Sequence, residues 1–128
     1  MRFAYTIVYV SDVEATLSFY ERAFEVKRRF LHESGTYGEL ETGATALAFA
    51  DEKIAPTSRP FRRNRREDDA AGAEVGFVTE DVEKAYAHAL LAGAEAVLGP
   101  TRKPWGQVVS YVRDCNGFLV ELCTEVSG

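Results

Sequence analysis

The sequence predicts an α+β fold of two tandem βαβββ units, whose curved mixed sheets surround a cleft. A repeated triplet is the first observation behind this prediction. Asp-Val-Glu occurs at residues 12–14 and again at 81–83, each time between a strand-like and a helix-like stretch. The second observation is that three short strand-like runs, separated by turns, follow each helix-like stretch.

The first half begins with a strand-like stretch that ends near Val10, and a helix is predicted over 12–24. Ser11 and Glu14 have the spacing of a capping box, and Asp12 places a negative charge at the helix N-terminus. The apolar side of this helix carries Val13, Leu17, Phe19, Tyr20 and Phe24. Three strands are predicted to follow, at about 26–33, 36–42 and 44–50.

The second half repeats this order. A strand ends near Val78, and a helix is predicted over 81–92, where Asp81 supplies the N-terminal charge and Gly93 ends the helix. The apolar side of this helix carries Val82, Ala85, Tyr86, Ala89 and Leu90. Its three strands are predicted at about 95–98, 107–113 and 118–125.

An arginine-rich connection over 51–72 divides the halves. It contains prolines, a glycine and five arginines within eight residues, namely Arg59, Arg62, Arg63, Arg65 and Arg66. Three acidic residues follow directly at 67–69, so the segment is predicted to be irregular and solvated, although the arginines also suit steering of an anionic ligand. We therefore interpret 1–128 as a single domain, with unit one at 1–50 and unit two at 73–128.

Composition excludes several classes of protein. The 128 residues are 46% hydrophobic and 27% charged, which is typical of a globular domain and excludes a disordered or collagen-like chain. The formal net charge of −5 argues against nucleic-acid binding. The apolar runs are far shorter than the ~20 residues that cross a bilayer, so no membrane segment is expected. Two cysteines and an N-terminus without a signal-peptide pattern predict a cytoplasmic protein.

The duplicated pattern resembles the vicinal-oxygen-chelate superfamily, which includes glyoxalase I, bleomycin-resistance proteins and extradiol dioxygenases. In the first half the resemblance depends on Val10-Ser11-Asp12-Val13 leading to Phe19-Tyr20. In the second half it depends on Glu74 to Val78, Gly106 to Asp114 and Asn116 to Leu122. The resemblance covers the whole chain apart from the connection. It implies the glyoxalase/bleomycin-resistance fold and a homodimer, and it leaves activity open because this fold carries many functions.

The resemblance also assigns four metal-ligand positions, on the first and last strands of the two units. In this sequence they carry Tyr5, Ala48, Glu74 and Glu121. A methyl group cannot bind a metal and a neutral phenol binds poorly, whereas three protein ligands are usual for a catalytic zinc. We therefore expect no cofactor. If a divalent metal is bound, Glu74 and Glu121 are its expected ligands.

Glu74 and Glu121 are also the candidate acid–base residues. Each lies between apolar neighbours in a strand, so it is expected to face away from the helix and, in this fold, towards the cleft. Two carboxylates facing one cleft would each raise the pKa of the other. One of them, protonated near neutral pH, would then serve as a hydrogen-bond donor or general base. An alternating surface strand explains both residues equally well.

The other candidate ligand-binding residues are mainly aromatic. Tyr5, Ile7 and Tyr9 share one face of the first strand, and alanines at 46, 48 and 50 leave space beside them on the fourth strand. This combination suits a flat organic ligand, although these aromatic residues also suit a core or a dimer contact. The remaining candidates are Trp105, in a Pro-Trp-Gly turn, and Tyr111.

Three functions follow from these residues. The first is metal-free binding of a small aromatic or cationic molecule, as in sequestration-type drug resistance. The second is a metal-dependent lyase, isomerase or dioxygenase with an altered ligand set, such as a glyoxalase I-like lyase. The third is metal-free acid–base catalysis with Glu74 or Glu121 as the base and Tyr5 as the proton donor. We favour the first function, and the sequence leaves open whether the protein is an enzyme.

Overall fold

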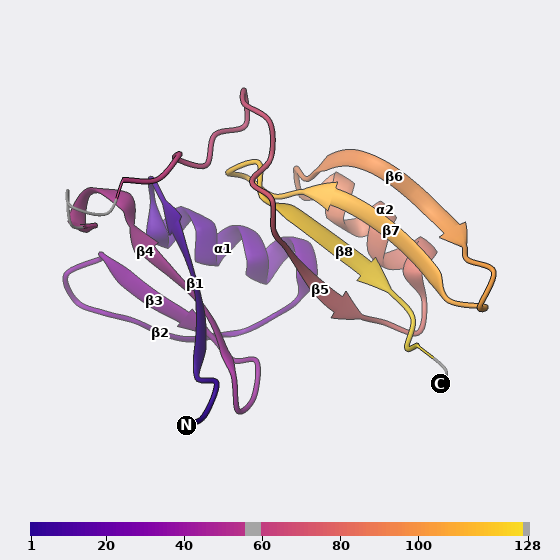
Figure 1. The fold of residues 1–128 in the computed structure, drawn as a ribbon, viewed down its shortest axis with the longest axis horizontal. Coiled ribbons are helices and arrows are strands. Elements are labelled where there is room, and N and C mark those ends of the chain that lie inside the picture. The colour runs from indigo at the N-terminus through magenta and orange to yellow at the C-terminus, as the bar shows by residue number, and fades with distance from the viewer. Residues whose placement is uncertain (56–59, 127–128) are drawn as a thin grey trace. The chain divides into compact units, whose positions relative to one another are not determined.

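Two units with the same order of elements make up the chain (Figure 1), and the predicted α+β fold of two βαβββ units is confirmed. The computed structural model describes residues 1–55 and 60–126. The first unit contains β1 (Tyr5–Val10), α1 (Val13–Phe24), β2 (Arg28–Leu31), β3 (Tyr37–Leu40) and β4 (Ala46–Asp51). The second contains β5 (Glu74–Val78), α2 (Val82–Leu91), β6 (Glu95–Arg102), β7 (Val108–Arg113) and β8 (Leu119–Cys123).

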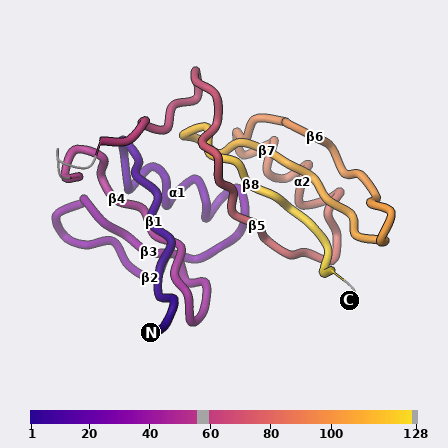
Figure 2. Tube along the Cα trace, viewed as in Figure 1, coloured from indigo at the N-terminus to yellow at the C-terminus, as the bar shows by residue number. Residues whose placement is uncertain are grey.

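The sheet of the first unit is mixed, with strand order β1-β4-β3-β2. Strand β1 runs parallel to β4, whereas the β4–β3 and β3–β2 pairs are antiparallel. Helix α1 packs against one face of this sheet (Figures 1 and 2). Tyr20 of α1 and Phe49 of β4 form the centre of this packing, with ring centroids 4.9 Å apart and both side chains fully buried.

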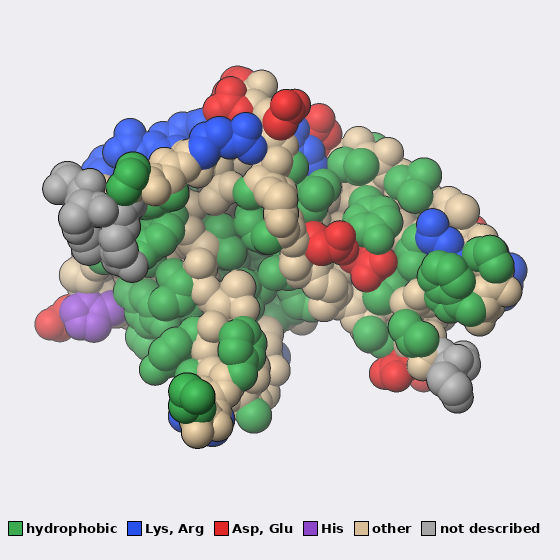
Figure 3. Space-filling model, in the orientation of Figure 1, with side chains coloured by type: hydrophobic (Ala, Val, Ile, Leu, Met, Phe, Trp, Pro, Cys, Tyr) green, Lys and Arg blue, Asp and Glu red, His purple; other side chains and the backbone are tan. Residues whose placement is uncertain are grey.

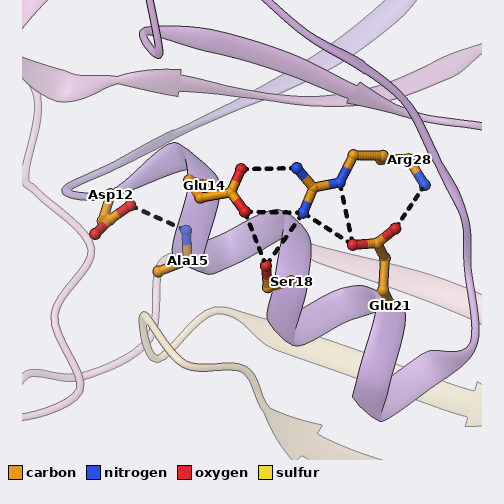
Figure 4. A network of polar contacts seen from close by, with 6 residues as sticks. All are labelled: Asp12, Glu14, Ala15, Ser18, Glu21 and Arg28. Carbon is orange, nitrogen blue, oxygen red and sulfur yellow. Dashed lines mark hydrogen bonds and ion pairs between the residues drawn. The ribbon is translucent and has the colours of Figure 1, made fainter.

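Helix α1 begins one residue later than a Ser11 capping box would require. Asp12 is the N-cap residue, and its carboxylate accepts a hydrogen bond from the backbone N–H of Ala15 at 2.9 Å. Glu14 instead binds the guanidinium of Arg28, which lies between Glu14 and Glu21 at 2.7 and 2.9 Å (Figure 4). The capping-box prediction was therefore wrong, because Glu14 joins α1 to β2 rather than closing the end of the helix.

The second unit has the corresponding strand order, β5-β8-β7-β6, with β5 parallel to β8. Helix α2 packs against β6, β7 and β8 (Figure 2). Its N-cap is Asp81, which accepts from the N–H of Lys84 at 3.0 Å, so both helices begin at the repeated triplet. Gly93 follows the C-terminus with a φ of 109°, as predicted for the residue that ends this helix.

Strand β6 is longer than the predicted 95–98. It continues to Arg102 through Gly99 and Pro100, and its register to β7 shifts twice, between Ala96 and Leu98 and between Leu98 and Thr101. Because β6 is an edge strand, a proline that donates no hydrogen bond is tolerated there. Gly99 and Pro100 therefore lie inside an irregular edge strand.

The connection is irregular over most of its described part but contains one short 3-10 helix, η1 (Glu52–Ile54). Pro56 and Arg59, which the sequence assigns to the connection, lie outside the described residues. The chain divides within the connection into two compact units, Met1–Asn64 and Arg65–Gly128. The arginine cluster is consequently shared between the units, with Arg62 and Arg63 in the first.

Candidate functional site

The first candidate surface is the side of the second sheet that carries Glu74, Tyr111, Glu121 and Cys123, here called the acidic face. The register opposes Tyr111 to Glu121 and Gly76 to Glu121, and Glu74 precedes Gly76 by two residues on the same side of β5. The Tyr111 hydroxyl donates a hydrogen bond of 2.8 Å to Oε2 of Glu121. The structure therefore brings together three of the residues predicted from sequence.

Gly76 leaves room for the Glu121 carboxylate. A Cβ atom at Gly76 would lie 3.4 Å from Oε1 of Glu121, in van der Waals contact with the carboxylate. With only a hydrogen atom at this position, Gly76 leaves the space beside the Glu121 carboxylate open. Partial burial, and then the negative charge of Glu121, raise the pKa of Glu74.

The same carboxylate affects two neighbouring groups. Its hydrogen bond, together with burial, raises the pKa of Tyr111 to about 12, so the phenol stays protonated and acts as a donor near neutral pH. Burial and the charge of Glu121 raise the pKa of the Cys123 thiol. A buried thiol with a raised pKa is a poor nucleophile.

Trp105 lies in the turn between β6 and β7 of the second unit. Its indole N–H donates to Oε1 of Gln107 at 2.9 Å, and the Gln107 amide donates to the carbonyl of Thr124 at 3.0 Å. Gln107 is buried, whereas 57% of Trp105 is exposed. The ring is therefore held by a fixed partner while much of its surface stays open to solvent. Sequence reasoning missed Gln107, because only the turn geometry brings it to Trp105.

The second candidate surface is the side of the first sheet opposite α1, here called the aromatic face. Tyr5, Ile7 and Tyr9 of β1 lie on it, paired in register with Ala46, Ala48 and Ala50 of β4. Tyr5 and Ile7 are exposed at 56% and 43%. The three alanines are almost completely buried, so the space expected beside them is closed to solvent in this structure.

A polar pair on the aromatic face was missed by the sequence analysis. The Tyr37 hydroxyl donates to Oε2 of Glu39 at 2.7 Å, and Arg29 binds the other carboxylate oxygen at 3.2 Å. Glu39 is buried and lies opposite Ala48 in the register. Burial and the hydrogen bond to Glu39 raise the pKa of Tyr37 well above its ordinary range. The alternation of β3 places both residues on this side, and that pattern was the available signal.

Phe61 of the connection also contacts the aromatic face. Its ring stacks on Tyr9, with centroids 4.7 Å apart and an angle of 21° between the planes. The Asn64 amide donates to the backbone carbonyl of Tyr9 at 3.0 Å. No pattern in the sequence indicates this contact, because it depends on how residues 60–64 fold back over β1. In Figure 3, Lys and Arg side chains follow the surface of this part of the connection.

The donor set at the four positions of the metal-ligand prediction does not fit a metal centre. Ala48 has no donor atom, and the remaining residues are one phenol and two carboxylates. Within residues 1–55 and 60–126, no three His, Cys, Asp or Glu side chains form a group able to hold a metal ion. These four positions therefore provide too few ligands for a catalytic metal ion.

Comparison with known proteins gives one consistent result. The family model described as the Glyoxalase/Bleomycin resistance protein/Dioxygenase superfamily matches residues 2–122. No curated protein matches the chain.

In the described part of the chain, neither helix is long and apolar enough to cross a membrane.

Several solved structures are similar over nearly the whole chain. A glyoxalase-related enzyme from Fulvimarina pelagi is 16% identical with a TM-score of 0.80, over 98% of this chain and 88% of that one. A glyoxalase/bleomycin resistance protein/dioxygenase family enzyme from Burkholderia phytofirmans PsJN is 17% identical with a TM-score of 0.77, over 97% and 98%. TioX from Micromonospora sp. ML1 is 21% identical with a TM-score of 0.71, also over 97% and 98%. At these identities the likeness establishes the fold.

Proposed function

Because the chain belongs to the glyoxalase/bleomycin resistance protein/dioxygenase superfamily, we propose that it binds a small aromatic or cationic organic molecule without a metal. The observation that carries this proposal is the pair of carboxylates on the acidic face. Neither Glu74 nor Glu121 forms an ion pair with any described residue. Two neighbouring carboxylates without a cationic partner repel each other, and a bound cation would relieve that repulsion.

The aromatic residues support the second part of the proposal. Trp105, which belongs to the same unit as the two carboxylates, presents an exposed ring that is fixed by Gln107. Aromatic rings bind flat organic molecules by stacking and attract organic cations to their faces. The metal-dependent alternative receives less support, because the donor set provides only two strong ligands, Glu74 and Glu121.

A calorimetric titration with berberine, a flat aromatic cation, tests this function. We expect berberine to bind the wild type equally well with and without EDTA, and about tenfold more weakly to Glu121→Gln and Glu74→Gln, because each variant loses one charge contact. Glu83→Gln, which changes an exposed glutamate of α2, is the matched control and should bind like the wild type. The anionic aromatic probe 1-anilinonaphthalene-8-sulfonate should bind more weakly than berberine.

Three outcomes would contradict the proposal. Absence of berberine binding would remove it, and equal binding of the anionic probe would remove the role of the carboxylates. Binding that disappears with EDTA and returns with a divalent metal would favour the metal-dependent alternative.

A further inference from the structure

Gly76 is an exposed glycine in the middle of β5, on the acidic face of the second unit. Its neighbours on the same side of the strand, Glu74 and Val78, are exposed as well, whereas the residues between them are half-buried. The row of side chains on this side of β5 therefore has a gap one residue wide, here called the Gly76 gap. Glu121 of β8 lies directly beside it in the register.

The fold itself does not require a glycine at this position. Gly76 has no positive φ, and β5 pairs regularly with β8 on both sides of it. Among the described residues, and apart from its neighbours in the chain, a Cβ atom at Gly76 would come within 4 Å of Glu121 alone. Gly38 of β3 is different, since a Cβ atom there would lie 2.6 Å from the Leu17 side chain and 3.1 Å from the carbonyl oxygen of Phe30. A glycine inside a strand weakens the strand, and it often marks a place that a ligand approaches closely.

The two oxygen atoms of the Glu121 carboxylate have different surroundings. Oε2 accepts the hydrogen bond of the Tyr111 hydroxyl at 2.8 Å, whereas Oε1 faces the Gly76 gap. Within residues 1–55 and 60–126, the Tyr111 hydroxyl is the only O–H or N–H group that bonds to Glu121. The Cys123 thiol also approaches this carboxylate, but a thiol is a weak donor. A carboxylate accepts at about four positions, so Oε1 keeps the capacity to accept a strong donor from a ligand.

From these observations we propose that the ligand places a protonated amine, with at least one N–H group, in the Gly76 gap. The inference rests on the proposed function and names the kind of cationic group that the acidic face selects. The N–H group donates a charge-assisted hydrogen bond to Oε1 of Glu121, and its positive charge lies beside Glu74, the next side chain on this side of β5.

The same geometry disfavours quaternary ammonium ions. A fully methylated nitrogen carries the same charge as a protonated amine but has no hydrogen atom to donate to Oε1. Its methyl groups also make it wider than the ammonium group of a primary amine, whereas the gap is the width of one side chain. The Gly76 gap therefore selects ligands by the hydrogen atoms on their cationic nitrogen, in addition to their charge.

The same sheet contains a matched control glycine. Gly99 of β6 also has no positive φ, and no atom lies within 4 Å of the position that its Cβ atom would take. It lies on the edge strand opposite to β5. Gly76→Ala and Gly99→Ala therefore add the same methyl group to two edge strands, and only the first methyl group enters the Gly76 gap.

The test is a calorimetric titration near neutral pH with naphthylmethylammonium and its N-trimethyl derivative, which have the same rings and the same charge. We expect the wild type to bind the primary amine about tenfold more tightly, because only this compound donates to Glu121. In Gly76→Ala the methyl group occupies the gap, so the primary amine should bind about tenfold more weakly and the trimethyl compound within about twofold of the wild type. Gly99→Ala should bind both compounds like the wild type.

The outcomes separate this inference from the function on which it rests. If neither berberine nor the two naphthyl compounds bind the wild type, both fail. If berberine binds and the primary amine binds no more tightly than its trimethyl derivative, only the selection of N–H groups is wrong. Equal weakening of the two compounds in Gly76→Ala, or equal weakening of the primary amine in Gly76→Ala and Gly99→Ala, would also overturn it.

A further compound keeps the test independent of the variants. Thermal unfolding without a probe shows whether Gly76→Ala folds, and we expect it to unfold at or above the temperature of the wild type, because alanine lowers the entropy of the unfolded chain. If it does not fold, the N-monomethyl derivative decides on the wild type alone. This compound keeps two N–H groups, so it should bind within about threefold of the primary amine. Binding as weak as that of the trimethyl compound would contradict the inference.

Discussion

Glu121 determines the properties of the groups around it on the acidic face. Its carboxylate accepts the hydrogen bond of Tyr111, raises the pKa of Glu74 by its charge, and adds to the raised pKa of Cys123. A single side chain thus contributes to the raised pKa values of a phenol, a thiol and a second carboxyl group. A ligand that neutralises Glu121 would change the ionisation of all three.

A pH titration of Tyr111 tests this dependence. The folded pKa of about 12 lies above the ordinary value of 10, mainly because the phenol donates its hydrogen bond to Glu121. In Glu121→Gln the phenolate no longer faces a negative charge, so we expect the pKa of Tyr111 to fall towards 10. The absorbance of tyrosinate near 295 nm measures this, with Tyr111→Phe as the blank that identifies the Tyr111 contribution. An unchanged titration in Glu121→Gln would show that burial alone sets the value.

The sign of the linkage follows from the same shift. Because the folded state holds the Tyr111 proton more tightly than the unfolded state, the unfolded chain loses this proton at a lower pH than the folded protein does. Between the two pKa values, a rising pH therefore favours the unfolded state. The contribution of Tyr111 to stability is therefore present below the unfolded pKa and decreases as the pH rises towards the folded pKa.

Sequence reasoning was sufficient for some residues of the candidate site and not for others. Strand alternation correctly places Tyr111 and Glu121 on one side of their sheet, because their side chains follow a period of two. The contact of Phe61 with Tyr9 could not be predicted, since it joins an irregular segment to a strand far away in sequence. Whether these residues bind a ligand remains a prediction.

At the scale of the elements, the β7–β8 turn holds the start of the second unit. The Arg113 guanidinium donates to the carbonyl oxygens of Asp68 at 2.6 Å and Gly117 at 2.8 Å. Gly117 has a φ of +85°, and a Cβ atom there would lie 2.6 Å from the carbonyl oxygen of Arg65. Glycine is therefore required at this turn both for its backbone conformation and for the close approach of residues 65–68.

We expect Gly117→Ala to destabilise the protein more than Gly35→Ala. Both glycines have positive φ, and alanine costs roughly 1–2 kcal/mol in that region. Gly35 has no atom within 4 Å of its Cβ position, whereas Gly117 is closely packed, so its substitution should cost about 1–3 kcal/mol more. Urea unfolding of both variants measures the difference. Equal losses would mean that residues 65–68 move aside without cost.

The elements themselves were largely predictable. Both helices begin at the repeated triplet because Asp12 and Asp81 cap them, and this signal is local in sequence. The errors, in contrast, have tertiary causes. Glu14 binds Arg28 of another element instead of the helix end, and β6 continues through Gly99 because an edge strand tolerates irregular register. Neither the tertiary ion pair nor the edge position is visible in the residue pattern.

At the scale of the whole molecule, the resemblance predicted a homodimer, and this remains a prediction. Sedimentation velocity at micromolar concentration should give twice the mass of one chain. Apolar side chains exposed on the strands, such as Tyr5, Ile7 and Val78, provide surface that a second copy would cover. A single species with the mass of one chain across the concentration range would contradict the prediction.

The pairing of strands has a consequence for how the chain folds. Every strand ladder in the described residues joins strands of one half, so β1 finds β4 and β5 finds β8 without crossing the connection. The entropy lost in closing each sheet is therefore that of a short chain, and the contact order resembles that of a protein half as long. During synthesis, the first half can complete its own sheet before the ribosome has produced the second.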